Sequence, residues 1–288
     1  APDMKQWYHA FCGLTQSQTL AFDRATLGGV TSQCVAFAFV AGYQSAIEQL
    51  FGEKDQRLSS LCVTEAEGNH PRAIKSLLEQ KHEYWLLSGS KQFVSGAEDA
   101  QRLFVACNTG CNASGNPRIK IVRIDLPHEG VCINALPELS FIPEVSHGKV
   151  VFENVKVTPD AVLEGDGYSD FVKPFRTAED IHVLGAVLAF RLGLGLRQAW
   201  SPALLEEHLA LLGCLRQLAQ LDYKAPMTHL QLAGVRHQLS HLIASSDATF
   251  EAADPAAYVR WQRDRSLLKV AMTAHEKRTE KAWQNLMP

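Results

Sequence analysis

Six short runs of β-favouring residues stand between two helical regions, and this change of pattern constrains the fold more than any other feature. Each run is rich in Val, Ile, Phe or Trp and is closed by Gly, Asn, Asp or Pro. The runs, all between Leu58 and Gly165, are LCVTEAEG, YWLLSGSKQFVSG, RLFVACNTG, RIKIVRIDL, GVCINAL and KVVFENVKVTPD. Strands at this spacing, with turn signals between them, predict an antiparallel sandwich or small β-barrel over residues 58–166.

Residues 1–57 have a helical pattern. Between Arg24 and Leu50 the apolar side chains recur at the spacing of a helix face. This helical pattern is interrupted by Gly28-Gly29 and by Gly42. The glycines indicate either close packing between helices or a break between two of them. We therefore expect a short N-terminal helical segment.

Four long helices are predicted over residues 167–288, where the β-favouring runs stop. The first begins near Ser169 or Thr177 and ends near Trp200. The starts of the next three are marked by proline at the first helical position, in the pairs Ser201-Pro202, Ala225-Pro226 and Asp254-Pro255. The last helix runs to about Asn285. Short connections make neighbouring helices antiparallel, so this region predicts a four-helix bundle. The fold class is α+β and multi-domain.

Charge and composition exclude several classes of partner. The formal net charge is -3, with acidic and basic residues interleaved, so we expect no nucleic-acid partner. No apolar run approaches the roughly 18 residues of a membrane span, and the N-terminus lacks a signal-peptide pattern, so we expect a cytoplasmic protein.

Cysteine and histidine positions do not indicate a metal site. Seven scattered cysteines are expected to be reduced structural thiols. His237 and His241 have the i, i+4 spacing of metal ligands, but the HExxH carboxylate is absent between them. We expect no metal.

Three motifs, in order, resemble those of the acyl-CoA dehydrogenases. Leu61–His70 (LCVTEAEGNH) is similar to the family's Thr-Glu signature, and Tyr84–Ala97 (YWLLSGSKQFVSGA) to its second barrel signature. Val151–Pro159 (VFENVKVTP) is similar to the family's last barrel strand. The resemblance implies that FAD accepts a hydride from the β-carbon of an acyl thioester while a carboxylate removes the α-proton.

The resemblance also implies which residues contact FAD. Thr64 would bond the flavin edge, with Phe93 and Ser95 beside the ring. The alternative is that Thr64 and Ser95 are ordinary polar residues at strand ends and that Phe93 belongs to the core.

Glu179 matches the position where some members carry the catalytic base, early in the first bundle helix. Asp180 replaces the arginine that commonly follows it. Desolvation beside an apolar cleft would raise the pKa of such a carboxylate. Alternatively, both acids only stabilise the helix N-terminus through its dipole.

The sequence also departs from the family. The helical segment before Thr64 is shorter than usual, and the Arg-x-x-Phe-Gly segment that reaches the adenosine half of FAD is missing, so the chain resembles a shortened, divergent member. Arg263-Asp264-Arg265 could contact a pyrophosphate, but we interpret it as a solvated helix face. We interpret Gly193 and Gly195 as helix-packing residues and not as a phosphate-binding loop.

These features lead to one main function and two alternatives. The main one is an FAD-dependent acyl-CoA dehydrogenase-like oxidoreductase of fatty acid metabolism that acts on the CH–CH group of an acyl-CoA, as a homodimer or homotetramer. The alternatives are a catalytically silent homologue that serves as an assembly or binding protein, and a flavin-dependent monooxygenase.

Overall fold

The structure, a computed structural model, describes residues 3–270 and 272–287. The chain divides into two compact units, which are described separately. Unit 1 comprises Ala1–Leu50, Ser140–Ile142 and Phe175–Pro288, and unit 2 comprises Phe51–Leu139 and Pro143–Pro174. The helices that begin and end the chain thus fall in one unit.

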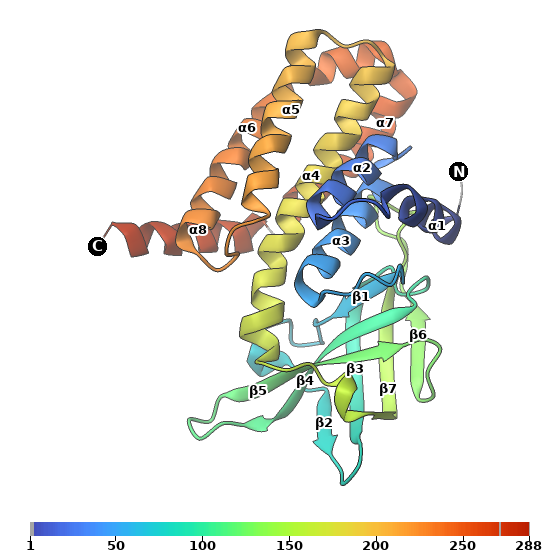
Figure 1. Cartoon of the computed structure of the whole chain (residues 1–288), viewed down its shortest axis with the longest axis vertical. Coiled ribbons are helices and arrows are strands. Elements are labelled where there is room, and N and C mark those ends of the chain that lie inside the picture. Colours follow the sequence, from blue (N-terminus) through green and yellow to red (C-terminus); the bar gives the residue numbers. More distant parts are fainter. Residues whose placement is uncertain (1–2, 271, 288) are drawn as a thin grey trace. The chain divides into compact units, whose positions relative to one another are not determined.

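Unit 1 is helical (Figure 1). Its helices are α1 (Met4–Thr15), α2 (Ala21–Thr31), α3 (Val35–Phe51), α4 (Lys173–Arg197), α5 (Pro202–Leu218), α6 (Pro226–Ala253), α7 (Pro255–Asp264) and α8 (Met272–Leu286). The two longest, α4 and α6, have 25 and 28 residues.

The predicted starts of three bundle helices are confirmed. Proline occupies the first position of α5, α6 and α7. The Ser201 hydroxyl accepts a hydrogen bond from the backbone N–H of Leu204 (3.4 Å), and the Asp254 carboxylate accepts one from Ala257 (2.9 Å). These caps satisfy amide groups that a helix N-terminus leaves without partners.

The first bundle helix begins differently from the expectation. A π-helical turn, Gly167–Val172, leads into α4, and the Asp166 carboxylate caps this turn by accepting from the N–H groups of Tyr168 and Ser169. Ser169 is therefore inside the turn, and Thr177 is buried within α4. Neither caps the helix.

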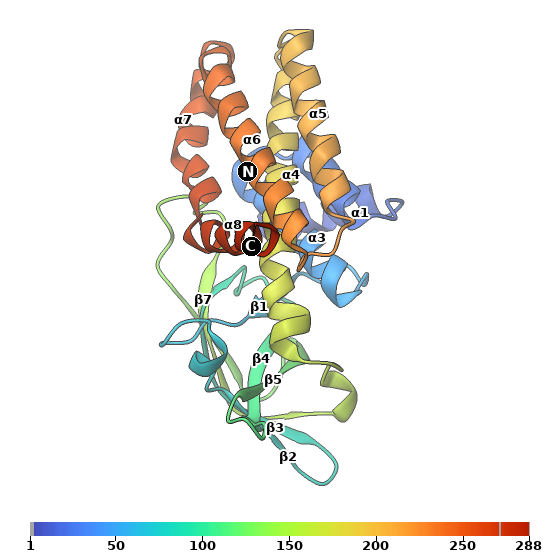
Figure 2. The ribbon, with the colours of Figure 1, turned by 90° about the vertical axis from the view of Figure 1, so that its left-hand side faces the viewer.

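The predicted fourth bundle helix is wrong as a single element. Residues Arg265–Lys269 form a 3-10 turn, and α8 then runs across the direction of α6 (Figures 1 and 2). The sequence between α7 and α8 contains no Gly or Pro that would mark the end of a helix. The 3-10 turn contains apolar residues, and its position is set by what these residues pack against. The helical periodicity of the sequence does not contain this information.

Glycines allow α2 and α3 to approach α4 closely, as one of the two interpretations of the sequence expected. A Cβ atom on Gly29 would lie 2.1 Å from the carbonyl oxygen of Ala186, and one on Gly42 would lie 2.6 Å from the Cα of Val183. Gly193 packs in the same way, with only 2.3 Å between its ideal Cβ position and the carbonyl oxygen of Val30. Any larger residue would push the helices apart.

Unit 2 contains a curled sheet of seven strands. They are β1 (Ser59–Cys62), β2 (Leu77–Gln80), β3 (Trp85–Ser95), β4 (Arg102–Cys111), β5 (Pro117–Asp125), β6 (Val131–Ala135) and β7 (His147–Val157). The order across the sheet is β1-β4-β2-β3-β7-β6, and β5 pairs with the other edge of β4. The two longest strands, β3 and β7, pair antiparallel along most of their length.

The sheet differs from the expected antiparallel barrel in two respects. Both β1 and β2 pair with β4 in parallel, so the sheet is mixed and curls into a half-barrel. The short strand β2 was not predicted, because its sequence LLEQ lies in a polar segment of the chain. Alternating side chains identify the faces of a strand, but they do not state the direction of its neighbour.

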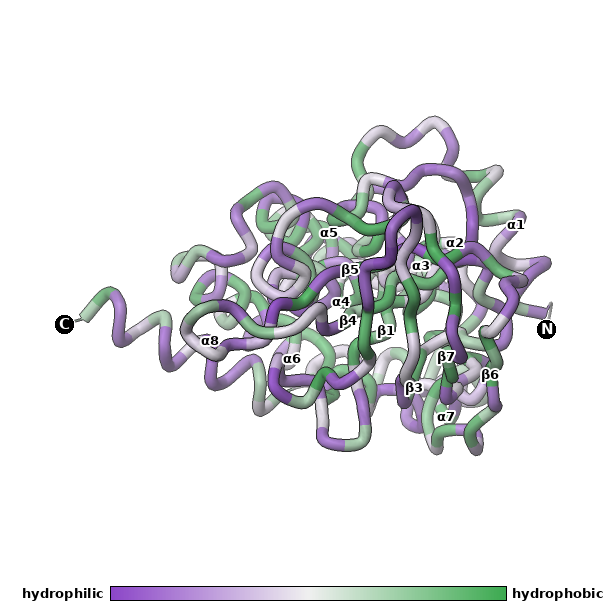
Figure 3. The backbone as a smooth tube through the Cα atoms, turned by 90° about the horizontal axis from the view of Figure 1, so that it is seen from below, coloured by the Kyte–Doolittle hydropathy of each residue, from purple (hydrophilic) through white to green (hydrophobic). Residues whose placement is uncertain are grey.

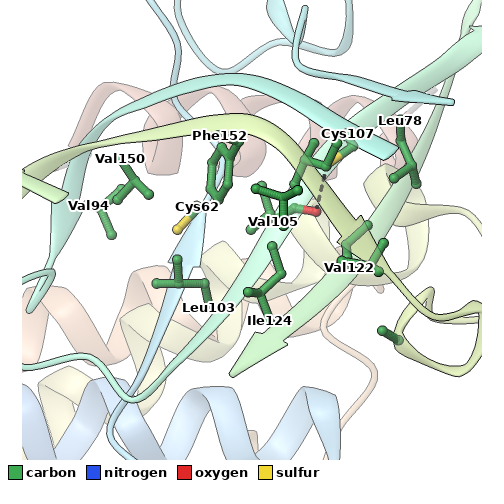
Figure 4. Close-up of a cluster of buried hydrophobic side chains, with 14 of the residues drawn as sticks. Cys62, Leu78, Val94, Leu103, Val105, Cys107, Val122, Ile124, Val150 and Phe152 are labelled. Carbon is green, nitrogen blue, oxygen red and sulfur yellow. Dashed lines mark hydrogen bonds between the residues drawn. The ribbon is translucent and has the colours of Figure 1, made fainter. Parts of the chain in front are cut away.

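The concave side of the sheet holds the core of unit 2 (Figure 4). Its side chains come from β1, β2, β3, β4, β5 and β7, and Leu103, Val105 and Val150 are fully buried. All seven cysteines are free, as expected. Cys62 and Cys107 lie in this core as small apolar residues, whereas Cys111, Cys132 and Cys214 are exposed. Burial of this apolar surface stabilises the curled sheet.

Among the described residues, no helix is both long and apolar enough to cross a membrane. Hydrophilic residues run along much of α8 (Figure 3), in agreement with its charged sequence.

Candidate functional site

The structure brings the three predicted flavin-contacting residues together at one edge of unit 2. The backbone N–H of Gln92 in β3 donates to the carbonyl oxygen of Thr64, over 2.8 Å. Phe93 follows Gln92 directly in β3, and Ser95 is the last residue of the strand. The segment after β1 is thus tied to the end of β3, where all three side chains are at least partly exposed.

Phe93 is not a core aromatic, which corrects the alternative interpretation of this residue. Its side chain is 66% exposed, and its φ is +54°, in the left-handed region that bulky residues rarely adopt. A register shift between Lys91 and Val94 marks a β-bulge at this point. An exposed aromatic ring held on a strained bulge is a feature that recurs at binding sites.

The Glu of the Thr-Glu motif and the Lys of the second motif form a buried ion pair. Lys91 Nζ lies 2.6 Å from Glu65 Oε1, and neither side chain is more than 9% exposed. The Glu65 carboxylate also accepts from the backbone N–H groups of Lys75 and Ser76. Burial raises the pKa of Glu65, but the bonds from Lys91 and these amides outweigh it and lower the pKa overall. These two charged residues therefore support the edge rather than react.

His147 is a polar neighbour of Ser95 that the sequence did not reveal. The Ser95 hydroxyl lies 3.2 Å from His147 Nε2, and His147 Nδ1 lies 3.0 Å from the carbonyl oxygen of Val145. The last predicted strand began at Lys149, whereas β7 begins at His147, directly opposite Ser95. Only the strand register could have paired the two residues.

Glu179 lies in α4, where it lines a small pocket of about 70 Å³ within unit 1. The other lining residues are Phe39, Asp180, Val183, Leu184, Arg236, Leu267, Leu268 and Val270. The Glu179 carboxylate forms no hydrogen bond or ion pair with the described part of the chain. Burial, and then the neighbouring Asp180, raise the pKa of Glu179 to about 7. A carboxyl group with this pKa can accept a proton near neutral pH.

Asp180 is held by two arginines from distant parts of the chain. Arg278 in α8 lies 2.6 Å from its carboxylate, and Arg236 in α6 lies 3.7 Å away. Both acids lie in the second turn of α4, which begins at Lys173. The dipole of a helix acts mainly on its first turn, so it does not explain Glu179 and Asp180.

The segment Arg263-Asp264-Arg265 is not a solvated helix face, which corrects its interpretation from the sequence. Asp264 is fully buried, pairs with Arg263 at 2.7 Å and accepts from the backbone N–H of Ile142 at 2.8 Å. Arg265 pairs with Asp247 at 2.6 Å. The segment contributes to the packing of unit 1.

A larger hollow of about 790 Å³ lies in unit 2, lined by residues of β2, β3, β4 and β5 together with Gly165 and Asp166. It includes none of the predicted site residues. The described residues also contain no group of three or more His, Cys, Asp or Glu arranged to hold a metal ion.

Comparison with known proteins gives partial sequence matches and extensive structural ones. No family model matches the chain. Over 116 residues it is 33% identical to the short/branched chain specific acyl-CoA dehydrogenase of Rattus norvegicus and 32% identical to that of Bos taurus. These matches cover 39% of this chain and only 27% of either relative.

The solved structures match over nearly the whole chain. Butyryl-CoA dehydrogenase of Megasphaera elsdenii superposes with a TM-score of 0.71 at 13% identity, over 98% of this chain and 90% of that one. FMN-bound TdsC of Paenibacillus gives 0.70 at 15% identity, over 98% and 91%. The FAD complex of PigA gives 0.65 at 11% identity, over 97% and 89%. The chain therefore has the fold of the acyl-CoA dehydrogenases.

Proposed function

We propose that the protein is a flavin-dependent oxidoreductase that oxidises the CH–CH group of an acyl thioester, with FAD as its cofactor and an acyl-CoA as its substrate. The observation that carries this proposal is Glu179, an unpaired carboxylate on an apolar pocket whose pKa is raised to about 7. The fold, which other proteins use to hold FAD or FMN, supports it.

The residues at the edge of unit 2 fit a flavin. Phe93 offers an exposed aromatic face for a planar ring, and Thr64 and Ser95 offer hydroxyl groups that can bond its polar atoms. The Thr64 hydroxyl has no hydrogen-bond partner among the described residues. Bound flavin would supply the hydride acceptor for the reaction.

Glu179 would act as the general base that removes the α-proton of the substrate. Deprotonation near neutral pH requires a carboxyl group that is more basic than usual, which its burial and the charge of Asp180 provide. Arg236 and Arg278 hold Asp180 in place, so the neighbouring charge is fixed. The apolar lining of the pocket would keep water from the base.

The first test is the visible spectrum of the purified protein, followed by anaerobic titration with butanoyl-CoA and 2-methylbutanoyl-CoA. We expect a flavin band, present on isolation or after addition of FAD, that one of these thioesters bleaches. Protein that takes up neither FAD nor FMN would show that the proposed function is wrong.

The second test replaces the base. Because the base must be deprotonated, we expect kcat/KM to rise with pH through about 7 and to level off above it. Glu179→Gln should reduce kcat by about 10²- to 10⁴-fold, while the fold and flavin content stay unchanged. Glu207→Gln, at an exposed position of α5, is the matched control and should leave turnover unchanged. Equal activity of the two variants would exclude Glu179 as the base.

A flavin-dependent monooxygenase on the same fold is the second candidate. It is favoured by the likeness to TdsC, which has been solved with FMN and indole, and to PigA, solved with FAD and proline. The same titration separates the two functions. A monooxygenase would keep its flavin oxidised with the thioesters, and it would consume dioxygen once the flavin is reduced chemically.

A catalytically silent homologue that serves as an assembly or binding protein is the third candidate. The short sequence match to the curated dehydrogenases is the reason to retain it. For such a protein Glu179→Gln would change no function. We also propose a cytoplasmic location, a role in fatty acid metabolism and a homodimeric or homotetrameric assembly, which cell fractionation, growth on fatty acids and light scattering can test.

A further inference from the structure

The Ser95 hydroxyl and the His147 imidazole form a hydrogen-bonded pair that the proposed reaction does not yet use. Ser95 is the last residue of β3 and His147 the first of β7, and the two are direct partners in the antiparallel register. Ser95 Oγ lies 3.2 Å from His147 Nε2. Both side chains are partly exposed, so the pair can contact a ligand at this edge of unit 2.

The second contact of His147 decides the direction of the hydrogen bond. Its Nδ1 lies 3.0 Å from the carbonyl oxygen of Val145, which can only accept, so Nδ1 carries the proton. Burial lowers the pKa of His147, which keeps the ring neutral near pH 7. In a neutral ring with the proton on Nδ1, Nε2 accepts. The Ser95 hydroxyl must therefore donate to His147.

The backbone on both sides of the pair is fixed. The Ser60 hydroxyl donates to the carbonyl oxygen of Ser95 at 2.7 Å, and the N–H of Gly96 donates to the carbonyl oxygen of Ser146 at 2.7 Å. The bulge at Phe93 lies two residues before Ser95. The Ser95 hydroxyl is thus held in place, and its only proton is donated to His147 Nε2.

We propose that His147 is a positioning residue that makes the Ser95 hydroxyl a hydrogen-bond acceptor toward the bound flavin. The inference rests on the proposed function, because it assumes a flavin beside Ser95. A hydroxyl oxygen has one proton and two lone pairs. Since the proton is given to His147, Ser95 can only accept from an N–H of the ligand.

This direction affects the redox properties of the ligand. When a flavin takes up two electrons and one proton, a ring nitrogen that was an acceptor becomes an N–H donor. An accepting hydroxyl beside that nitrogen bonds the reduced form and not the oxidised one. Without His147, the hydroxyl can turn and donate to the oxidised form. His147 therefore favours the reduced flavin.

The experiment measures the midpoint potential of the FAD-loaded protein against a reference dye. His147→Leu should shift the ratio of affinities for the two redox states about tenfold toward oxidised flavin, which is about 30 mV for a two-electron couple. His147→Gln, whose amide oxygen can accept from Ser95, should restore a potential close to that of the wild type. His128→Leu is the matched control, because His128 also contacts a backbone carbonyl, that of Glu129, and has no serine partner.

A double-mutant cycle with Ser95→Ala shows whether His147 acts through Ser95. In the Ser95→Ala background, His147→Leu should cause no further change in potential. Equal shifts in the two backgrounds, or a His147→Leu potential identical to that of the wild type while FAD is bound, would overturn the inference and leave the proposed function intact. Wild-type protein that takes up no flavin would instead overturn both.

Discussion

At the scale of single residues, the buried ion pair of Glu65 and Lys91 gives two motif residues a structural role. Glu65 lies between a lysine in β3 and two backbone N–H groups after the turn at Pro71–Ala73. Its carboxylate thus joins three segments beside the edge that carries Thr64 and Phe93. A buried charge that loses its partner is far more costly than an exposed one.

Replacing Lys91 tests this role. Lys91→Met leaves the Glu65 carboxylate buried without a cation, so we expect the free energy of unfolding of unit 2 to fall by about 3–5 kcal/mol. Lys81→Met is the control, because Lys81 and its partner Glu79 are 40% and 48% exposed, and it should change stability by less than about 1 kcal/mol. Urea unfolding followed by circular dichroism measures both. Equal midpoints would refute the structural role of Lys91.

Close contacts between helices characterise unit 1 at the scale of elements. Gly29 and Gly193 bring α2 against α4, and Gly42 brings α3 against α4, at distances that exclude a Cβ atom. These contacts determine where α4 lies against its neighbours and therefore where the pocket residues Phe39 and Glu179 meet. Glycine is needed at these three positions for the space it leaves, because none of the three has a positive φ.

Two Gly→Ala substitutions distinguish the steric effect of an added Cβ atom from the gain in helix propensity. Gly42→Ala should destabilise unit 1 by about 1–3 kcal/mol, because its Cβ would lie 2.6 Å from the backbone of Val183. Gly234→Ala, at an exposed position of α6 with nothing within 4 Å, should stabilise it by about 0.5–1 kcal/mol. Denaturant titrations give both values. A stabilising effect of both substitutions would contradict the close packing.

At the scale of the whole molecule, three buried histidines make unit 1 sensitive to acid. His182, His208 and His275 are all in unit 1, and burial lowers the pKa of each to about 4. The unfolded chain binds protons at these residues below about pH 6.5, whereas the folded chain does not until about pH 4. The three histidines therefore lower the stability of unit 1 as the pH is lowered through this window, whereas Glu179, whose pKa is raised to about 7, acts in the opposite direction.

For His182, which is fully buried, we expect this loss to reach about 2–3 kcal/mol at pH 4.5. Urea midpoints at pH 7, 6, 5 and 4.5, followed by ellipticity at 222 nm, measure it. His182→Leu should weaken the pH dependence, and His241→Gln, at an exposed position of α6, should leave it unchanged. A His182→Leu variant with the same pH dependence as the wild type would exclude this contribution.

Features that depend on a few neighbouring residues could be predicted from the sequence. Proline at the first position marked the starts of α5, α6 and α7, because the cap and the proline act within one turn. The motif around Thr64 and Ser95 identified the fold that the structural comparisons confirm. Glu179 was singled out by its place in a motif, although whether it is the base stays a prediction.

Features that depend on contacts between distant segments appeared only in the tertiary structure. The pairing of Ser95 with His147 joins residues 52 apart, and that of Asp180 with Arg278 joins residues 98 apart. The exposure of Phe93, the parallel pairing of β1 with β4, and the break between α7 and α8 likewise depend on packing. Hydrophobic periodicity and caps are local, so by themselves they determine the elements and their buried faces. Strand register and the partners of buried charges follow from how those faces meet, which only the folded chain decides.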